Sequence, residues 1–308
     1  MASSAQPRVQ GIEVKYLKPS IYRRDRREDI MRHLRTLMVS KMGHRNDPAS
    51  LPPMAVITHD AIGEEIIAHG LYEREPLKLL FEQVFSDQRD LFARSVAIDV
   101  GANIGNHSIF FAKHFKKVLA FEPGEIAFAL LNINKKIASC DNLELHNFGL
   151  GDQNTFSRMA AAEPDNIGTN TIIADEDGIG ERIELRSGDE AIPPLLQGQE
   201  RISLVKIDVE GFDEQVITGM KEILKTHSPI ILFEVDGARH PERTERTVAL
   251  LRSVGYGKFY TLKRKILFPK IRNFAARAVL RTFAGSNFVL DEEDEFQAYE
   301  NMVIALPA

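Results

Sequence analysis

Cysteine is nearly absent from this 308-residue sequence, and tryptophan is missing altogether. The single cysteine, Cys140, excludes an intramolecular disulfide and a metal site built from several thiolates. So little cysteine favours a reducing compartment, and we expect a cytoplasmic protein. The opening residues, MASSAQPRVQ, contain no apolar stretch of the kind that forms a secretory signal.

Long hydrophobic runs and an excess of positive charge are also lacking. No apolar run approaches the roughly 18–20 residues that a membrane-spanning helix requires. The net charge of -5 weighs against a dedicated nucleic-acid binder, and we expect no nucleic-acid partner. Hydrophobic residues at 44% and charged residues at 27% are typical of a globular chain with a sizeable core.

From about residue 91 onward, short apolar runs alternate with amphipathic stretches. This alternation predicts an α/β fold with a mostly parallel sheet covered by helices on both faces. The expected strands are Ser95–Val100, Lys117–Phe121, Leu143–Phe148, Leu204–Ile207, Ile230–Val235, Phe259–Leu262 and Met302–Leu306. The expected helices are Asn106–His114, Glu125–Ala138, Phe212–Lys225 and Glu242–Ser253. A ligand is then expected beyond the carboxyl ends of the strands.

Residues 1–90 form an expected N-terminal helical extension, of which about the first ten residues are disordered. Between Lys15 and Arg45 there are ten basic residues against three acidic ones. Ile30, Leu34 and Leu37 recur there at helical spacing. This pattern fits a solvated surface helix, and it also fits a homodimer contact or a surface that guides the substrate.

The densest motif is SVAIDVGANIGNHSIFF, from Ser95 to Phe111. An apolar run ends in Asp99, a turn with Gly101 and Gly105 follows, and a helix then begins. Glycine allows the backbone of such a turn to approach a ligand. The next strand ends in Glu122, where an acid suits the two hydroxyls of a ribose.

Asn103 stands where a dinucleotide fingerprint would require its second glycine, so a pyrophosphate fits poorly. A ligand with a ribose, an amino-acid end and no phosphate fits better, and S-adenosylmethionine is such a ligand. The turn could instead serve only the packing of strand on helix. A nicotinamide-dependent oxidoreductase on a similar sheet is a further alternative.

The third strand region reads NLELHNFGLGD and ends in Asp152. Strand counting puts this carboxylate at the same edge of the sheet, where it could accept a hydrogen bond from an adenine amine. It could equally satisfy local backbone donors in a turn.

Acidic residues gather where two later strands end. Asp208, Glu210 and Asp213 follow the fourth strand, and Glu234 lies near the end of the fifth. Unpaired carboxylates are costly to bury, so these must face a cleft, a cation or backbone donors. Asp213 suits a helix N-terminus. Asp208 and Glu234 could hold substrate hydroxyls, accept a proton or bind a divalent cation.

The chain resembles the FkbM family of S-adenosylmethionine-dependent methyltransferases. The resemblance rests on AIDVGANIGNHSIFFAK, VLAFEPG, LVKIDVEGFDEQVITGM and ILFEV in that order, preceded by GLYEREPLKLL. It implies a Rossmann-like class I methyltransferase fold with seven strands, the last antiparallel, in a catalytic domain over 91–308. It implies O-methylation, often of a sugar, a glycan or glycolipid unit, or a polyketide-like molecule.

The resemblance also implies roles for individual residues. The cofactor would be carried by Asp99, Gly101, Asn103, Gly105 and Glu122. Asp208 and Glu210 would lie near the transferred methyl group, and Tyr72 and Glu73 would close over the cofactor. The sequence does not exclude methylation of a small amine instead of a hydroxyl.

Methyl transfer to a hydroxyl also needs a group that takes the proton. We expect Asp208 in this role, with Glu234 as its partner, provided that burial or a neighbouring carboxylate raises the pKa of Asp208 above about 3.9. His240 is a second candidate base. His107 lies inside the cofactor turn and is more suited to packing or capping.

A basic segment lies near the end of the chain. The stretch 259–288 holds seven basic residues and no acid, and DEEDE follows at 291–295. We expect an insertion that caps the site, holds an anionic substrate, contacts a membrane surface peripherally, or packs as an ordinary surface helix.

Overall fold

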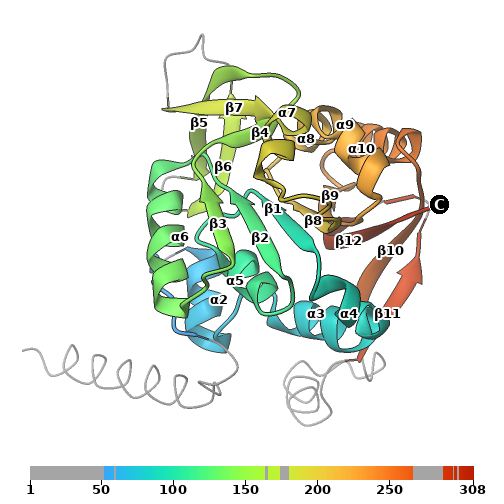
Figure 1. Ribbon diagram of the computed structural model, residues 1–308, viewed down its shortest axis with the longest axis horizontal. Helices are drawn as coiled ribbons and strands as arrows, with labels where there is room; N and C mark the ends of the chain where they lie inside the picture. The colour runs from blue at the N-terminus through green and yellow to red at the C-terminus, as the bar shows by residue number, and fades with distance from the viewer. Residues whose placement is uncertain are drawn as a thin grey trace, which may run out of the picture.

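The computed structural model describes residues 52–58, 60–163, 166–173, 180–265, 287–293, 295–296 and 298–308. Its centre is an eight-stranded sheet in the order β11-β10-β12-β9-β8-β1-β2-β3 (Figure 1). The strands are β1 (Val96–Val100), β2 (Lys117–Phe121), β3 (Leu143–His146), β8 (Ile202–Ile207), β9 (Ile230–Asp236), β10 (Tyr256–Lys265), β11 (Asn287–Glu292) and β12 (Tyr299–Pro307).

Strands β1, β2, β3, β8 and β9 pair in parallel, and the final strand β12 is antiparallel to β9. The predicted Rossmann-like class I fold, with a mostly parallel sheet and an antiparallel last strand, is therefore confirmed. The described sheet has eight strands rather than seven, because β11 pairs with β10 as an additional edge strand.

Side chains of alternate residues in the central strands enter two separate cores. Val96, Ile98 and Val100 of β1 pack against the helices α8 (Asp213–Gly219), α9 (Lys221–His227) and α10 (Pro241–Ser253). Ala97 faces the opposite core, which contains residues of α5 (Asn106–Ala112) and α6 (Glu125–Ala138). Because both faces are covered, all five residues of β1 are buried.

The described part of the region before β1 is largely helical. It contains α2 (Ala61–His69), α3 (Arg74–Leu79), the π-helical turn Leu80–Val84, the 3₁₀ turn Ser86–Gln88 and α4 (Arg89–Phe92). Leu77, Leu80 and Phe81 are nearly inaccessible and belong to the core that also contains α5. The helices from α3 to α4 therefore share the core of the main sheet. The basic stretch Lys15–Arg45 lies outside the described residues.

The expected helix Phe212–Lys225 is divided into α8 and α9 at Met220, whose φ and ψ of -117° and 13° are not helical. A Cβ on Gly219 would lie 1.7 Å from the carbonyl oxygen of Gly151. The end of α8 thus approaches the neighbouring backbone too closely for any side chain at that position.

A second sheet, absent from the sequence prediction, follows β3. Its four strands have the order β4-β7-β5-β6, with bounds β4 (Gly149–Gly151), β5 (Thr155–Glu163), β6 (Asn166–Ile173) and β7 (Glu181–Ser187). The short helix α7 (Gly188–Ala191) and a 3₁₀ turn (Pro193–Leu195) then lead back to β8.

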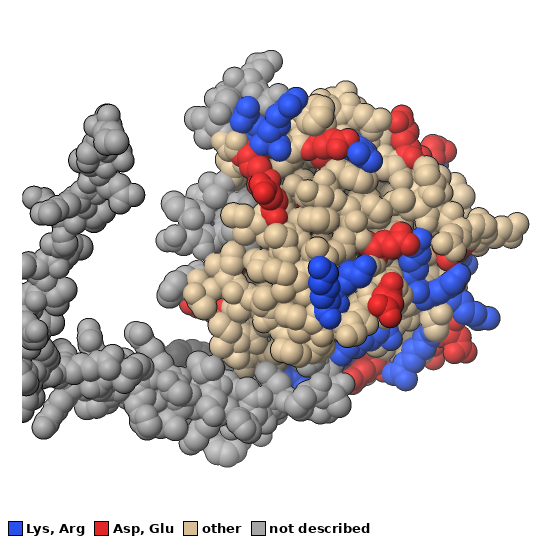
Figure 2. Space-filling model, turned by 60° about the vertical axis from the view of Figure 1, so that its left-hand side comes forward, with Lys and Arg blue, Asp and Glu red and all other residues tan. Residues whose placement is uncertain are grey.

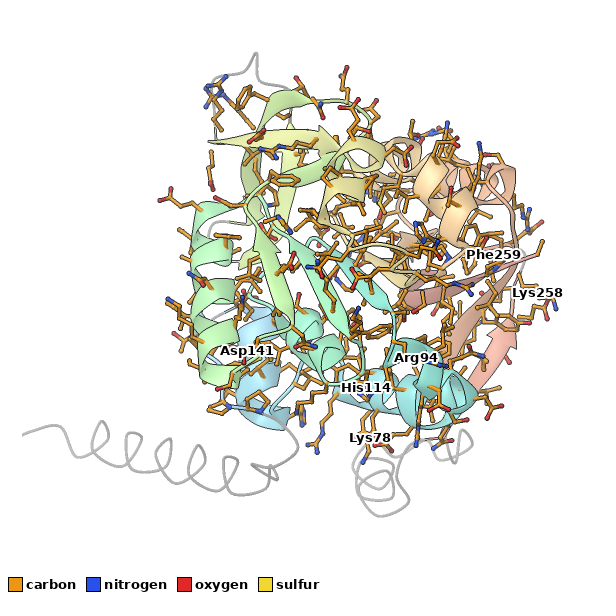
Figure 3. All side chains as sticks on the ribbon, viewed as in Figure 1. Lys78, Arg94, His114, Asp141, Lys258 and Phe259 are labelled. Carbon is orange, nitrogen blue, oxygen red and sulfur yellow. The ribbon has the colours of Figure 1, made fainter. Side chains whose placement is uncertain are left out.

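The predicted insertion at 259–288 is wrong in its first part. Residues up to Lys265 continue β10, which pairs with β12 on one side and β11 on the other. Phe259 is buried while its neighbour Lys258 is exposed, as the alternation of a strand requires (Figure 3). Lys263 pairs with Glu293 of the acidic stretch. Residues 266–286 lie outside the described part of the chain.

The described surface seen in Figure 2 carries charges of both signs close to one another around a broad uncharged area. Within the described residues, no helix combines the length and the apolar character that crossing a membrane would demand.

Candidate active site

A cavity of about 280 Å³ opens at the carboxyl ends of the central parallel strands. Its floor is formed by the β1–α5 turn and by the ends of β2, β8 and β9, the place predicted for a ligand. Its lining includes Tyr72, Asn103, His107, Glu122, Met159, Ile172, Lys206, Asp208, Glu210 and Glu234. Residues from β5, β6, β8 and β9 and from several helices and turns therefore surround one space.

The glycines of the β1–α5 turn are required by packing against the protein itself. Gly101 has a φ of 76°, and a Cβ there would lie 1.9 Å from the carbonyl oxygen of Asp208. Gly105 has a φ of 92°, and its Cβ would lie 2.5 Å from Leu131 of α6. From the sequence, we expected these glycines to let the backbone approach a ligand. In the structure, they allow the turn to pack against the end of β8 and against α6.

Glu122 and Asn103 form the polar floor of the cavity. Glu122 is 6% exposed and accepts hydrogen bonds from the backbone N–H groups of Asn103 and Gly124, both at 2.8 Å. Burial raises the pKa of Glu122 to about 7, although these two hydrogen bonds act in the opposite direction. The side-chain oxygen of Asn103 is buried without a hydrogen-bond partner in the described structure.

Asp99 does not reach the cavity. It is fully buried below it, and its Oδ2 accepts a hydrogen bond of 2.6 Å from the hydroxyl of Ser108. Its Oδ1 lies 3.5 Å from Nζ of Lys206. The predicted direct contact of Asp99 with a cofactor is therefore wrong for this structure, because its side chain points toward α5 and β8.

Asp208 lies at the end of β8 with its side chain 34% exposed, and its Oδ2 is 3.0 Å from Nζ of Lys206. Burial disfavours its charged form, but the charge and hydrogen bond of Lys206 outweigh that effect, and the pKa of Asp208 is lowered. A proton-accepting role for Asp208 required a raised pKa, and this condition is not met, because the ammonium of Lys206 lies beside the carboxylate.

Glu234 and Tyr72 complete this end of the cavity. Glu234 lies in β9, which pairs with β8 in parallel. Asp208 and Glu234 therefore line the same cavity, as their positions in the sequence indicated. Burial raises the pKa of Tyr72, and the nearby carboxylates of Glu73, Asp208 and Glu234 act in the same direction.

Glu210 has a φ of 45° and lines both this cavity and a smaller neighbouring one that contains Arg243. Burial, Asp208 and Asp213 raise the pKa of Glu210 to about 7, while Arg243 opposes them. The residue itself is exposed to solvent, whereas Asp208 is half-buried beside Lys206.

The segment that carries Tyr72 and Glu73 is fastened to α5. The backbone N–H of Tyr72 donates to Oδ1 of Asn106 at 2.9 Å, and the amide of Asn106 donates to the carbonyl of Tyr72 at 3.1 Å. Glu73 lies 3.1 Å from Nε2 of His107, and both side chains are nearly buried. His107 thus holds this segment beside the cavity.

Two predicted site residues lie elsewhere. The main-sheet strand β3 ends at His146, and Asp152 follows β4 of the second sheet, where it is exposed and outside the described cavity lining. The adenine contact of Asp152 stays a prediction, and the chain changes sheets before this residue. His240 is exposed at the start of α10 and does not line the cavity either.

Several lining residues were missed by the sequence argument. Lys206 interrupts the apolar run ISLVKI, and a charged residue within an otherwise buried strand was a usable signal. Met159 and Ile172 come from β5 and β6, where no sequence signal indicated a wall of the site.

A divalent cation was one sequence interpretation of Asp208 and Glu234. The described residues contain no group of three or more His, Cys, Asp or Glu side chains arranged to hold a metal ion. Asp208 already has the ammonium of Lys206 as its positive partner.

Comparison with known proteins identifies the chemistry. The family model of the methyltransferase FkbM domain matches residues 99–257, just over half of the chain. "Methyltransferase 1" of Beauveria bassiana is 24% identical over 194 residues, which span 55% of this chain and 70% of that protein. Hexuronic acid methyltransferase AglP of Haloferax volcanii is 30% identical over 162 residues, which span 52% of this chain and 61% of that protein.

A solved structure of methyltransferase FkbM from Methylobacillus flagellatus is 13% identical to this chain, with a TM-score of 0.40. The alignment covers 90% of this chain and 60% of the chain in that structure.

Proposed function

The chain belongs to the FkbM methyltransferase family and is therefore a methyltransferase; from this we propose that it transfers a methyl group from S-adenosylmethionine to a hydroxyl oxygen of a sugar, alone or in a glycan or glycolipid. The observation that carries the proposal is that a single cavity joins the β1–α5 turn and Glu122 to the carboxylates at the ends of β8 and β9.

The residues of the turn fit the nucleoside part of this cofactor. The carboxylate of Glu122 can accept hydrogen bonds from the two ribose hydroxyls. The unpartnered oxygen of Asn103 can accept one from the cofactor's amino groups. The apolar side chains of Ile104, Ala127 and Met159 line the same cavity and offer a surface for a planar base.

The bound cofactor supplies an electrophilic methyl group, and the protein's task is to orient the acceptor and take its proton. Asp208 remains ionised at neutral pH and is suited to accept a hydrogen bond from an acceptor hydroxyl. Glu210, with a pKa of about 7, is better matched to proton removal. We assign the orienting role to Asp208 and Glu234 and the proton-accepting role to Glu210.

The charges of the cavity support a neutral acceptor. Asp208, Glu210 and Glu234 line it, and Lys206 is already paired with two carboxylates. Carboxylates bind hydroxyl donors and repel anions. The similarity to a protein named hexuronic acid methyltransferase supports a sugar as the acceptor, and the charges of this cavity favour a sugar without a free carboxylate.

The proposal is tested by incubating the protein with methyl-labelled S-adenosylmethionine and a panel of acceptors. The panel holds neutral hexosides, uronic acids, small amines and fractionated cell extract, and mass spectrometry identifies the product. We expect a methyl ether on a neutral sugar hydroxyl. Labelled product from the amines alone would support N-methylation, and a methyl ester would show that a carboxylate is the acceptor.

With an acceptor in hand, Glu210→Gln is expected to lower kcat by about 10²-fold or more while the affinity for S-adenosylhomocysteine is retained. Asp208→Asn is expected to act mainly on the KM of the acceptor. The reverse pattern would return the proton-accepting role to Asp208, as the sequence first indicated. The nicotinamide-dependent alternative is excluded by the family of the chain.

A further inference from the structure

Lys206 is a charged residue near the end of a buried strand. It is 5% exposed, and the other five residues of β8 are buried too. Because alternate residues of a strand face the same side, Lys206 shares the side of Leu204, which packs in the core that contains α5. An ammonium in such a place is costly unless it is paired.

The pairing of Lys206 links three elements. Its Nζ lies 3.0 Å from Oδ2 of Asp208 on its own strand and 3.5 Å from Oδ1 of Asp99 on β1. Asp99 in turn accepts the hydroxyl hydrogen bond of Ser108 from α5 at 2.6 Å. One carboxylate of the pair is fully buried, whereas that of Asp208 borders the cavity. The chain of contacts therefore runs from the core to the proposed acceptor site.

We propose that Lys206 is a positioning residue, whose ammonium, anchored by Asp99, holds the Asp208 carboxylate ionised and fixed in direction at the edge of the cavity. Asp99 is the buried counter-charge of this ammonium, and its other carboxylate oxygen accepts the hydroxyl hydrogen bond of Ser108. Oδ2 of Asp208 faces the ammonium of Lys206, and the Asp208 side chain also lines the cavity. This assigns Asp99 and Lys206 to the support of the site and Asp208 to contact with the acceptor.

The other charges around Asp208 do not supply the same restraint. Lys206 has the largest effect among the groups that lower the pKa of Asp208, and His107 has a smaller effect in the same direction. His107 is occupied by Glu73. Several elements bring titratable groups to face the Lys206–Asp208 pair. These groups are Asp99 of β1, Tyr72 and Glu73 before α3, His107 of α5, Glu210 of the β8–α8 turn, Asp213 of α8 and Glu234 of β9. Most of these are acidic, so removing Lys206 leaves Asp208 in a negative environment.

The orienting role of Asp208 toward an acceptor rests on the proposed function, but the action of Lys206 on Asp208 can be measured without any acceptor or cofactor. Carbon-detected NMR of protein labelled at the aspartate carboxyl carbons follows the titration of each side chain, and Asp208→Asn identifies the relevant signal. In Lys206→Met, we expect the pKa of Asp208 to rise by about 1–3 pH units relative to the wild type.

Ser108→Ala is the matched control, because it removes a partner of Asp99 and leaves Lys206 and Asp208 in contact. It is expected to leave the pKa of Asp208 low. Lys206→Met leaves Asp99 buried without its cation, which is a large cost to the stability of this variant. The double variant Lys206→Met/Asp99→Asn avoids that cost, and its Asp208 is expected to titrate higher than in Asp99→Asn alone.

An unchanged pKa of Asp208 in the Lys206 variants would overturn the proposal and reduce Lys206 to a counter-ion of Asp99. The titration of S-adenosylhomocysteine into the same samples gives a separate result. If the ligand does not bind the wild type, the proposed function fails, while the effect of Lys206 on Asp208 is still decided by NMR.

Discussion

At the scale of single residues, Gly101 combines a left-handed backbone with a backbone neighbour that cannot move aside. Its φ is 76°, and the carbonyl oxygen of Asp208 occupies the position of a Cβ. We expect Gly101→Ala to lower the free energy of unfolding by at least about 2 kcal/mol in urea denaturation.

Gly198 provides the control for this substitution. Its φ is 61°, but no atom lies within 4 Å of an added Cβ. Gly198→Ala should cost about 1 kcal/mol, the backbone cost alone. Equal costs for the two variants would show that the contact of Gly101 with β8 is not as tight as the structure indicates.

Glu122 leads to a prediction for pH dependence. Because burial raises its pKa to about 7, the carboxyl group is mostly protonated below that pH and ionised above it. Ribose hydroxyls bind the ionised form, so affinity for S-adenosylhomocysteine should increase as the pH rises through 7. Calorimetry is expected to give binding about tenfold weaker near pH 6 than near pH 8.

Glu122→Gln removes this titration and should make the affinity nearly independent of pH over the same range. The wild-type dependence would then belong to Glu122 and not to Glu210 or Asp213, which titrate nearby. A flat profile in the wild type would contradict the assignment of Glu122 as the ribose ligand.

Individual residues were predictable where a motif fixed both position and environment. Asn103, Glu122 and Asp208 lie in the cavity because the ends of parallel strands meet at one edge. Charge pairing across strands was not predictable, since the partnership of Lys206 with Asp99 depends on the order of β1 and β8 in the sheet. The direction of the pKa of Asp208 was missed for that reason.

At the scale of elements, the β5–β6 hairpin forms a wall of the cavity. Met159 of β5 and Ile172 of β6 line it, and Met159 is 7% exposed. We expect Met159→Ala to weaken binding of S-adenosylhomocysteine by about threefold to tenfold in calorimetry, through loss of apolar contact.

Phe156 on the same strand is the control, because it is 51% exposed and stacks with Arg182 at 4.1 Å instead of lining the cavity. Phe156→Ala should leave the affinity unchanged. If the two substitutions have the same effect, the hairpin acts through stability and not through the wall that it builds.

Elements with a clear apolar pattern were predicted closely. The helix α6 and the strand β2 begin and end at the residues expected from the sequence. The second sheet was missed because its strands depend on pairing with each other more than on burial. In β7, for example, buried residues are few, and the strand is held between β4 and β5. The break between α8 and α9 arises from the contact of Gly219 with β4, which no local pattern reveals.

At the scale of the whole molecule, the order of the strands determines which side chains share the cavity. The central strands β2, β1, β8 and β9 are neighbours and end on one side, so the turn after β1 faces the carboxylates that follow β8 and β9. This arrangement followed from the alternation of strands and helices in the sequence. The sequence did not indicate that α2, through Ala61 and Ile62, and the second sheet also line the cavity. These contributions depend on contacts between distant parts of the chain.

The most direct test of the account is a crystal structure of the full chain with S-adenosylhomocysteine. We predict that the ribose hydroxyls lie within hydrogen-bonding distance of Glu122 and that the sulfur faces the end of the cavity lined by Asp208 and Glu234. A ligand bound outside this cavity, or a cavity filled by the protein's own side chains in the complex, would contradict the assignment of the methyl-donor site.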